Sequence, residues 1–560
     1  MPKYLIFIFI GFFSLQIFGQ KTYDFTNPVD IPIYLSGNFG ELRSNHFHAG
    51  IDIKTGGKEG LKVYAIEDGF VYRIKITRGG YGKALYIKHP NGLLSVYGHL
   101  KYFNDEIEAY IKQKQYEKKS FEIEMFPYKI ELPVKKGEVI AYSGNTGGSF
   151  GPHLHFELRN MQEHPLNPMA YGIDIADHKH PIIQNIFAYP LGKNTQVNQS
   201  EKQVKLSLSK KNDSLYVSDS ITAFGEIGIG LQAFDRQDFS WNKNGLYKVR
   251  MTINGLPVYE HIMQEFSFAK SHFINTMIDY PYYSSTHKRV IKLWVEPYNL
   301  LEIYTQLVND GKIKIDAYKN YYINLQLSDY AGNTTQVIIP ILGKKLKVLV
   351  PKKIQKTSHL ISAGKNQSLV FDKFKLSFGK YSLYKDLYLK AKTLSDGIFI
   401  NLKGVPIHKS IQIKYALKNI PAKLRTYAFI GKLNKKGKLR YTYSRKSKDS
   451  LIAYTKISGT YKIGFDSIPP IIKPLNFVAK DHLNNYRWLK LKIWDKNTGI
   501  KSYNGYIDGQ WILLEYNQKK SMITYDFSDR KLKGYKHKLK IVVKDLLENT
   551  TTYQTDFYKK

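Results

Sequence analysis

Two histidines that alternate with apolar residues carry the strongest chemical signal in this chain. They lie in the segment GNTGGSFGPHLHFEL, residues 144 to 158. Successive side chains of a strand point to opposite faces, so the apolar residues of HLHFEL are expected to face a core and the polar ones to face outward. The outward set consists of His153, His155 and Glu157. This pattern places a metal-binding group and a proton-carrying group side by side.

The spacing of the two histidines argues against both of them binding one small ion. Side chains at i and i+2 of a strand start about 6 to 7 Å apart at the backbone. Zinc-ligand bonds are only about 2 Å long. We therefore expect one histidine on a metal and the other to reach water or substrate, and a second segment must complete the site.

The segment NHFHAGIDI, residues 45 to 53, supplies the missing ligands, because His48 and Asp52 stand four residues apart. The glycine and the two isoleucines between and after them disfavour a helix. A turn at Ala49-Gly50 is expected to bring both side chains to one ion. His46 is a competing ligand, ranked lower because its partner four residues on is Gly50, which has no side chain.

A third segment, YGHL at residues 97 to 100, adds another histidine. His99 is expected on the same strand face as Ser95 and Tyr97, near a glycine that permits a turn. Three separated segments thus each deliver a histidine beside a glycine.

Residues 31 to 172 resemble the lysostaphin and LytM type of zinc metallopeptidases, which cleave peptide cross-bridges of bacterial cell walls. The resemblance covers about a quarter of the chain and rests on five motifs that occur in the order of that family. The motifs are HAGID (48 to 52), GLKVYAIEDGFV (60 to 71), GYGKALYIKHPNG (80 to 92), YGHL (97 to 100) and SGNTGGSFGPHLHFEL (143 to 158).

The resemblance implies particular roles for the five candidate residues. The zinc ligands would be His48, Asp52 and His155, and the catalytic histidines would be His99 and His153. Three protein ligands leave the fourth tetrahedral position for water, as in catalytic sites. Zinc lowers the pKa of such a water and polarises the scissile carbonyl.

The division of labour between the catalytic histidines is a hypothesis. The chain has no His-Glu-x-x-His sequence, so a glutamate base on a helix is not expected. His153 is the expected proton acceptor, and His99 is expected to position the water or to stabilise the oxyanion. Glu157 is expected to orient a ligand or to lie at the surface. The glycines at 144, 147, 148 and 151 are interpreted as walls of a substrate groove.

The first residues read as a secretory signal peptide, residues 1–20. Lys3 is followed by a short apolar run, residues 4 to 18, with expected cleavage near residues 19 to 21. That run is shorter than the roughly 20 residues of a spanning helix, and no later segment is apolar enough to span. The chain has no cysteine, which excludes disulfides and a lipid-bearing cysteine. We expect an exported protein in the periplasm, cell envelope or extracellular space, with no transmembrane segment in the mature chain.

The net charge of the chain limits the classes of partner that it is expected to bind. Lys and Arg number 84 against 47 Asp and Glu, a formal net charge of +37. Such a charge attracts polyanions. Nucleic acid is disfavoured, because the chain has an export signal and no recognisable nucleic-acid-binding motif. Peptidoglycan stem peptides and anionic cell-envelope polymers are the expected partners.

We predict a mainly β fold with four domains. A LytM-type antiparallel β peptidase domain (21–175) is expected to contain a helical insertion at about 101–133, with Asn104 as the helix cap. An Ig-like β-sandwich (176–345), a β-rich domain of unknown type (346–465) and a C-terminal Ig-like β-sandwich (466–560) follow.

An internal repeat supports the two Ig-like sandwiches. Asn254-Gly255 and Asp508-Gly509 are expected to make tight hairpin turns in corresponding places. The stretches 321 to 341 and 537 to 557 are also parallel in pattern.

The expected activity is that of an exported zinc metalloendopeptidase on peptide cross-links of peptidoglycan. The resemblance leaves open whether the bond is D-alanyl to diaminopimelate or lies in a glycine-rich bridge. The alternative is a noncatalytic cell-wall-binding or amidase-activating scaffold with a LytM fold. An exported protease acting on other proteins, or a lytic weapon against other bacteria, is a third reading.

Overall fold

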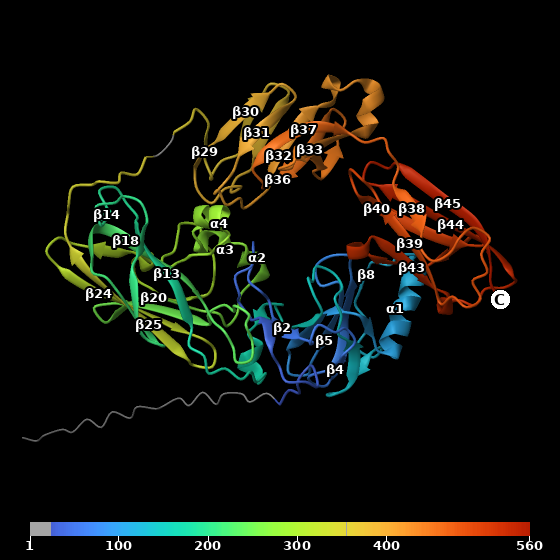
Figure 1. The fold of residues 1–560 in the computed structure, drawn as a ribbon, viewed down its shortest axis with the longest axis horizontal. Helices are drawn as coiled ribbons and strands as arrows, with labels where there is room; N and C mark the ends of the chain where they lie inside the picture. Colours follow the sequence, from blue (N-terminus) through green and yellow to red (C-terminus); the bar gives the residue numbers. More distant parts are fainter. Residues whose placement is uncertain (1–23, 354–355) are drawn as a thin grey trace, which may run out of the picture.

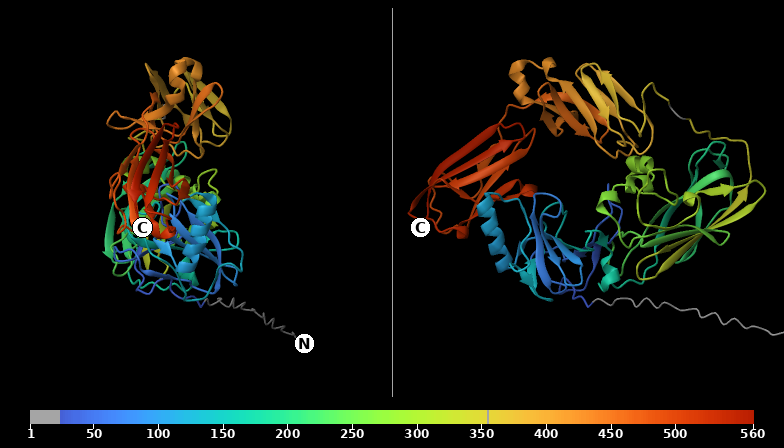
Figure 2. Two further views of the ribbon diagram at one scale, coloured as in Figure 1. Left: turned by 90° about the vertical axis from the view of Figure 1, so that its right-hand side faces the viewer. Right: turned by 180° about the vertical axis from the view of Figure 1, so that it is seen from behind.

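The computed structural model describes residues 24–353 and 356–560, so the predicted signal peptide lies outside the described residues. Four β-rich units follow one another and are arranged as a ring (Figure 1). The ring is narrow when seen from its edge (Figure 2). Each unit has its own core of buried apolar side chains. The predicted mainly β fold class is confirmed.

The first unit is built on an antiparallel sheet with the order β1-β2-β11-β6-β5-β4-β8. Its strands are β1 (Leu35–Gly37), β2 (Ile51–Lys54), β4 (Gly69–Ile76), β5 (Lys83–Lys88), β6 (Leu94–Leu100), β8 (Ile123–Met125) and β11 (His153–Arg159). A small second sheet contains β3 (Lys62–Tyr64), β7 (Tyr102–Phe103) and β10 (Val139–Tyr142). One apolar core lies between the two sheets.

The alternation in β11 follows the sequence prediction on one face only. Leu154, Phe156 and Leu158 are completely buried in the core. The opposite face is covered as well, because His155 is 3% and Glu157 0% exposed. The polar side chains that were predicted to face outward therefore lie inside a polar cluster rather than in solvent.

The predicted insertion forms α1 (Asp105–Lys118). The helix begins where expected, because the Asn104 side chain accepts a hydrogen bond of 3.0 Å from the Ile107 N–H. Ile107 and Ile111 are buried in the core of the first unit. A neighbouring face of α1 contacts the fourth unit through a 2.6 Å ion pair between Lys112 and Asp529. The insertion is thus a contact surface between units.

The second unit contains β13 (Ile182–Pro190), β18 (Ile221–Phe234), β19 (Lys248–Ile253), β20 (Leu256–Ile262), β24 (Asn320–Ser328) and β25 (Thr334–Gly343). The predicted turn at Asn254-Gly255 connects β19 and β20, with φ of 48° and 84°. Positive φ at both central residues is the requirement of a type I′ hairpin turn. The three short helices of this unit are α2 (Phe268–Ser271), α3 (Ile274–Met277) and α4 (Tyr280–Thr286).

The third unit has two five-stranded sheets around one core. One sheet contains β27 (Gln367–Phe371), β28 (Phe374–Phe378), β32 (Ile411–Ala416), β36 (Ser450–Thr455) and β35 (Ser444–Lys446). The other contains β30 (Lys390–Leu394), β31 (Gly397–Asn401), β37 (Gly459–Phe465), β33 (Ala428–Leu433) and β34 (Leu439–Tyr441).

The fourth unit repeats the hairpin of the second. It has one sheet of β38 (Ile471–Pro474), β39 (Trp488–Trp494), β43 (Met522–Asp526) and β42 (Glu515–Asn517). The other sheet has β41 (Gln510–Ile512), β40 (Ile500–Ile507), β44 (Lys536–Asp545) and β45 (Thr550–Tyr558). The turn between β40 and β41 is Asp508-Gly509, with φ of 50° and 78°, as the repeat predicts.

The ring closes where the fourth unit packs on the first. Trp511 and Leu513 belong to the core of the first unit, although they lie more than 330 residues further along the chain than Ile173, the last buried first-unit residue of that core. The Trp511 ring meets Tyr116 of α1 at 5.5 Å. The buried Lys83 ammonium pairs with the Glu515 carboxylate at 3.4 Å. No helix within the described ranges is both long enough and apolar enough to cross a membrane.

We predict that Trp511→Ala releases the fourth unit from the first. Removing a buried tryptophan costs about 3 to 5 kcal/mol, and here most of that loss falls on the contact between units. Small-angle scattering should report a larger radius of gyration, and protease should cut faster in the connection at residues 466–470. Trp241→Ala is the matched control, because Trp241 is 85% exposed. Equal behaviour of the two variants would contradict the assigned contact.

Candidate metal centre

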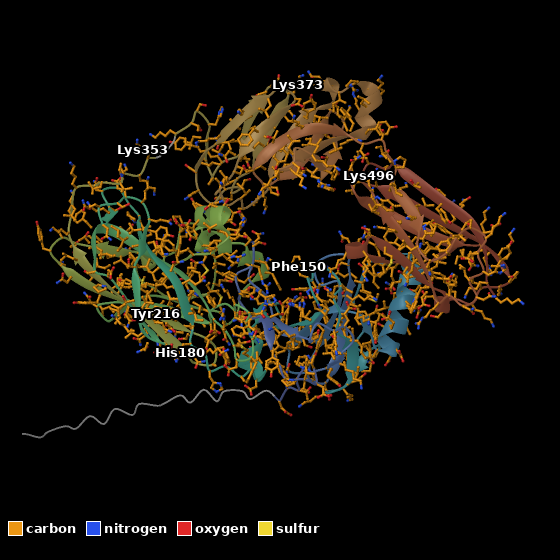
Figure 3. All side chains as sticks on the ribbon, in the orientation of Figure 1. Phe150, His180, Tyr216, Lys353, Lys373 and Lys496 are labelled. Atoms are coloured by element: carbon orange, nitrogen blue, oxygen red, sulfur yellow. The ribbon has the colours of Figure 1, made fainter. Side chains whose placement is uncertain are left out.

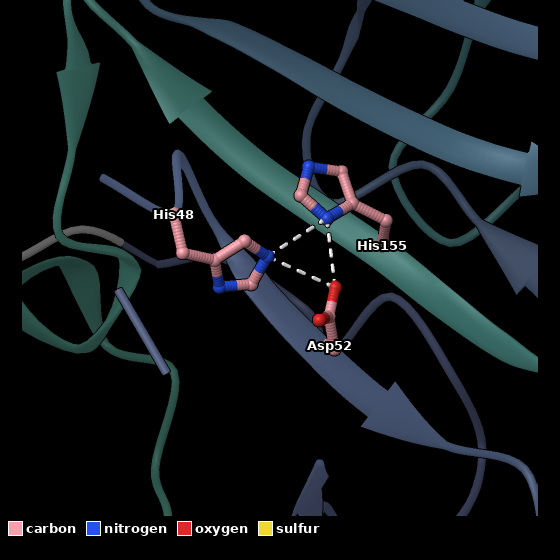
Figure 4. Close-up of side chains that lie close together, drawn as sticks. All are labelled: His48, Asp52 and His155. Atoms are coloured by element: carbon pink, nitrogen blue, oxygen red, sulfur yellow. Dashed lines mark hydrogen bonds and ion pairs between the residues drawn. The ribbon is translucent and has the colours of Figure 1, made fainter. Parts of the chain in front are cut away.

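The register between β2 and β11 brings two of the predicted ligands together. Asp52 and His155 are directly opposite each other in this antiparallel pair. Such cross-strand neighbours have Cβ atoms about 5 Å apart and share one face of the sheet. His48 precedes β2 and reaches the same place (Figure 4). The exposed His46 is not in this group, so its lower rank is supported.

Three atoms meet at this point. Asp52 Oδ1 lies 3.0 Å from His48 Nε2 and 2.8 Å from His155 Nδ1. The two histidine nitrogens are 3.2 Å apart. Zinc bonds of about 2.0 to 2.2 Å at tetrahedral angles separate neighbouring ligand atoms by roughly 3.3 Å. The three atoms are therefore spaced to share one ion.

The outer nitrogens of both histidines are already engaged. His48 Nδ1 lies 2.8 Å from the Asn38 carbonyl oxygen, and His155 Nε2 lies 2.7 Å from Glu157 Oε1. A carbonyl or carboxylate oxygen only accepts, so in a neutral ring the proton sits on the outer nitrogen. Burial lowers the pKa of His155, but its hydrogen bonds to Asp52 and Glu157 raise it to about 9, so a cation takes the place of the second proton of this ring. Both inner nitrogens then present lone pairs to a carboxylate oxygen. Three acceptors that converge without a donor fit a cation, and the site residues thus fit zinc.

Glu157 orients His155 from within the protein and is not at the surface. Its other oxygen accepts a 2.7 Å hydrogen bond from Arg159 Nε, and the Tyr81 hydroxyl donates to Oε1. Burial raises the pKa of Glu157, but Arg159 and His155 outweigh burial and hold it at about 2. A charged carboxylate behind the ring raises the basicity of the ligand nitrogen.

The carboxylate of Asp52 is held in its charged form. Burial raises its pKa, but the charge of His48 and hydrogen bonds from His153, His155 and His48, whose inner nitrogens carry protons when no ion takes their place, hold it well below its usual range. Arg43 adds an ion pair of 3.0 Å to Asp52 Oδ2, the oxygen that faces away from the two ligand nitrogens. Asp52 thus offers a negative Oδ1 to an ion.

Gly50 is needed for a reason other than the predicted turn. It lies at a bend, but its φ is not in the left-handed region. A Cβ atom there would lie 2.1 Å from the Phe156 carbonyl oxygen on β11. Close approach of two strands therefore selects glycine at this position.

The prediction that His99 shares a face with Tyr97 is wrong. Tyr97 is buried in the apolar core, whereas the His99 ring lies 4.8 Å from the ring of His153 and 5.8 Å from that of His155. His99 has a positive φ of 60°, and the pairing of β5 with β6 shifts register near it. A bulge of this kind reverses the side-chain alternation and turns His99 toward the site.

His99 and His153 are oriented like the ligand histidines. His99 Nδ1 lies 2.9 Å from the Thr146 carbonyl oxygen, and His153 Nδ1 lies 2.9 Å from that of Gly151. In the neutral rings the Nε2 atoms therefore carry no proton, and His153 Nε2 lies 3.4 Å from Asp52 Oδ1. Burial and the neighbouring histidines lower the pKa of His99 to about 3, so its ring is neutral. All five predicted residues come together.

The glycine-rich loop does not have the predicted role at every position. A Cβ atom on Gly144 would lie 2.5 Å from the Lys101 amide nitrogen, and one on Gly147 would lie 2.3 Å from that of Gly82. These two glycines pack against the protein's own backbone. Gly151 has open space where a Cβ would be, so its role as a groove wall stays a prediction.

Sequence reasoning missed Asn38, Arg43 and Tyr81. Asn38 acts through its main-chain carbonyl, which no side-chain pattern records. Arg43 lies five residues before the HAGID segment, and Tyr81 lies in GYGKALYIKHPNG. Neither belongs to a periodic pattern of charged or apolar residues that would mark it as part of the site.

The segment that carries these residues matches Peptidase family M23 over residues 46–119 and 121–168. We refer to the unit that contains this matched segment as the M23 domain. Residues 358–466 match the Zu5-like domain, which gives the third unit a type that the sequence analysis left unknown.

The M23 domain is similar to parts of larger proteins. It is 34% identical over 132 residues to the DD-carboxypeptidase/endopeptidase Mpg of Neisseria meningitidis, covering 24% of each chain. It is 34% identical over 134 residues to the murein hydrolase activator NlpD of Salmonella dublin, covering 24% of this chain and 28% of that one. The chain spans about a quarter of the length of the curated relatives it matches.

One solved structure that is similar to part of this chain is that of a zinc containing peptidase from Vibrio cholerae. It has 27% sequence identity and a TM-score of 0.20, and the match covers 26% of this chain and 39% of that one.

We predict that Gly50→Ala separates β2 from β11 in the M23 domain. The added methyl group collides with the Phe156 carbonyl and destabilises the domain by about 1 to 3 kcal/mol or more. Elemental analysis should show loss of bound zinc, and thermal unfolding should occur at a lower temperature. Gly79→Ala is the control, since a Cβ atom there meets nothing within 4 Å. A Gly50→Ala protein with full zinc content would disprove the close-approach argument.

We predict that Glu157→Gln weakens zinc binding roughly 10- to 100-fold, because His155 loses its charged partner. Competition with a chelating dye measures the affinity, and circular dichroism verifies that the variant is folded. Glu106→Gln, at an exposed position in the first turn of α1, should bind zinc like the wild type. If Glu157→Gln also binds zinc like the wild type, Glu157 does not tune the ligand.

Proposed function

We propose that this chain is an exported zinc metalloendopeptidase that hydrolyses peptide cross-links of bacterial peptidoglycan. One observation carries the proposal. The three converging acceptors of His48, Asp52 and His155 are joined by the free Nε2 atoms of His99 and His153. A metal site that served structure alone would not need two further proton-accepting rings beside it.

His48, Asp52 and His155 would hold the zinc ion. When bound, zinc supplies a Lewis acid that polarises the scissile carbonyl and makes water a stronger nucleophile near neutral pH. The rest of the chemistry belongs to the side chains around the ligands.

His153 is proposed to take the proton from the attacking water. Its Nδ1–H is fixed on the Gly151 carbonyl, so Nε2 is the basic atom and faces the ligand group. The Ser149 hydroxyl, 3.2 Å from Nδ1, also restrains the ring. After protonation His153 can deliver the proton to the leaving amine.

His99 is better suited to position water than to stabilise an oxyanion. Its Nδ1–H is bonded to the Thr146 carbonyl, which leaves Nε2 as an acceptor. The low pKa of His99 keeps the second proton off this ring, so it has no N–H to offer to an oxyanion. An acceptor can hold a water molecule by one hydrogen while the oxygen attacks. Of the two roles left open by the sequence, the geometry favours this one.

The substrate class is supported by the relatives and by charge. Mpg is named as a DD-carboxypeptidase/endopeptidase, and NlpD is named as an activator of murein hydrolases. The net charge of +37 favours adsorption to anionic envelope polymers outside the cell. A location in the periplasm or cell envelope follows from the predicted export signal.

A noncatalytic activator is the second candidate, because NlpD is among the relatives. A scaffold of that kind has no use for a complete set of ligands with ordered proton positions. The intact His48, Asp52 and His155 group therefore favours the enzyme.

We predict that zinc-loaded protein converts cross-linked muropeptides to uncross-linked ones, and that a chelator stops the conversion. His153→Ala and His99→Ala should each lower turnover at least 100-fold while zinc content stays near that of the wild type. Mass spectrometry of muropeptides before and after incubation measures the product and identifies the bond.

His178→Ala is the control for this experiment, because the side chain of His178 is 86% exposed and far from the ligands in sequence. Cross-linked fragments that remain intact with zinc-loaded wild type would favour the activator. Loss of zinc from His153→Ala would show that His153 is itself a ligand.

A further inference from the structure

A second cluster of metal-binding side chains lies where the chain passes from the M23 domain into the second unit. A pocket of about 570 Å³ is lined there by Asp177, Asp235 and Asp329. Asp177 belongs to the connection between the units, Asp235 directly follows β18, and Asp329 directly follows β24. One carboxylate oxygen from each lies within 4.8 Å of the other two. Oxygens bound at about 2.3 to 2.6 Å to one ion can be that far apart.

The same pocket contains a buried side chain with an unused acceptor. Gln237 is 4% exposed and lines the pocket, and its Oε1 has no hydrogen-bond partner among the described residues. Asp235 is 2% exposed, and its carboxyl group shares a hydrogen bond with that of Asp177. Native proteins rarely leave a buried acceptor unmatched, so the Gln237 oxygen indicates a ligand in this pocket.

Three positive side chains lie close in sequence to the three aspartates and have other partners. The Arg236 guanidinium lies over the rings of Phe234 and Trp241, at 5.4 and 5.8 Å. His178 Nδ1 lies 2.7 Å from the Asp238 carboxylate, and Lys179 Nζ donates to the Gln237 carbonyl oxygen at 3.2 Å. Burial and the charges of the other two carboxylates raise the pKa of Asp235 to about 8. A bound cation would relieve this repulsion.

The fourth unit repeats the arrangement at equivalent places. Asp466 lies in the connection before the unit, Asp495 directly follows β39, and Asp545 ends β44. Their carboxylate oxygens also lie within 4.8 Å of one another. Asp466 is 2% exposed, and its Oδ2 has no hydrogen-bond partner within the described chain.

The supporting hydrogen bonds are repeated too. Asn333 Nδ2 donates to the Asp177 carbonyl at 3.1 Å and to Asp329 Oδ2 at 2.7 Å. In the fourth unit, Asn549 Nδ2 donates to the carbonyl of Asp466 at 2.9 Å and to Asp545 Oδ2 at 2.7 Å. In both units, an asparagine side chain thus joins the segment that enters the unit to an aspartate at the end of a strand.

We propose that the pocket of Asp177, Asp235, Asp329 and Gln237 binds a calcium ion, and that the Asp466, Asp495 and Asp545 cluster binds a second one. The donors are oxygens alone, which suits a hard cation, whereas zinc prefers nitrogen and sulfur. Water fills the rest of the six to eight positions that calcium takes. Each ion ties the connection entering a unit to two loops of that unit.

The test uses the full chain, treated with EDTA that is then removed, and CaCl2 as the probe. Calorimetric titration should give two calcium ions per chain for the wild type and one for Asp235→Asn and for Asp466→Asn. Asp238→Asn is the control and should still bind two, because Asp238 pairs with His178 outside the cluster. Asp177→Asn, at a half-buried position in the connection, gives a second measurement of the first site if Asp235→Asn does not fold.

Thermal unfolding distinguishes a role of Asp235 in binding calcium from a role in the fold alone. Without calcium, Asp235→Asn should be about as stable as the wild type, because the raised pKa of Asp235 already leaves this buried carboxyl group largely uncharged near neutral pH. With saturating CaCl2 the melting temperature of the wild type should rise more than that of the variant. The first site of the variant should bind calcium at least tenfold more weakly than the first site of the wild type.

A wild type that takes up no calcium overturns the proposal. So does a first site that binds calcium with unchanged affinity in both Asp235→Asn and Asp177→Asn. Neither measurement depends on peptidase activity, so the outcome is independent of the proposed function.

Discussion

The direct pairing of Asp52 with His155 across two antiparallel strands is the constraint on which the site depends. A shift of one residue between β2 and β11 would turn one of these side chains into the apolar core, because strand side chains alternate. Gly50 makes the register possible, since only glycine lets the chain pass within contact of the Phe156 carbonyl. The neighbouring cross-strand pair, Ile51 and Phe156, is apolar and completely buried. Ordinary core packing therefore fixes the spacing of two ligand atoms.

The third ligand depends on the second unit. Phe47, which precedes His48, is buried in the core of that unit, and its N–H donates to the Ser271 hydroxyl at 2.8 Å. On the other side, Asn38 holds His48 through its carbonyl and exchanges two hydrogen bonds with Gly245, at 2.9 and 2.8 Å. Asn38 also lines the pocket of the aspartate cluster. The metal centre is thus partly built by a unit that contains none of its ligands.

Much of the site could be predicted from sequence because it follows local rules. The alternation of apolar and polar residues predicted which face of β11 lies in the core. The Asn-Gly and Asp-Gly dipeptides predicted two hairpin turns, and Asn104 predicted the start of α1. What could not be predicted arises from contacts between distant segments. The bulge that turns His99 toward the site depends on how β5 pairs with β6, and the need for Gly50 depends on a carbonyl more than 100 residues away. The two Ig-like assignments and the domain boundaries stay predictions, although the four separate cores agree with four units.

The fourth unit contacts the glycine-rich loop beside the site, so the arrangement of the units as a ring has a physical consequence for the site. Lys519 Nζ donates to the Asn145 side-chain oxygen at 2.7 Å, and Asn145 precedes Thr146, whose carbonyl fixes His99. Figure 3 shows Phe150, in the same glycine-rich loop, beside the space that the four units enclose. Its side chain is fully exposed. A loop with several glycines has high conformational entropy, so an anchor at one end reduces the freedom of the segment that orients His99 and His153. The second unit restrains His48 and the fourth restrains the loop that orients His99 and His153, so the geometry of the five-residue site is shared among units that could not each supply it alone.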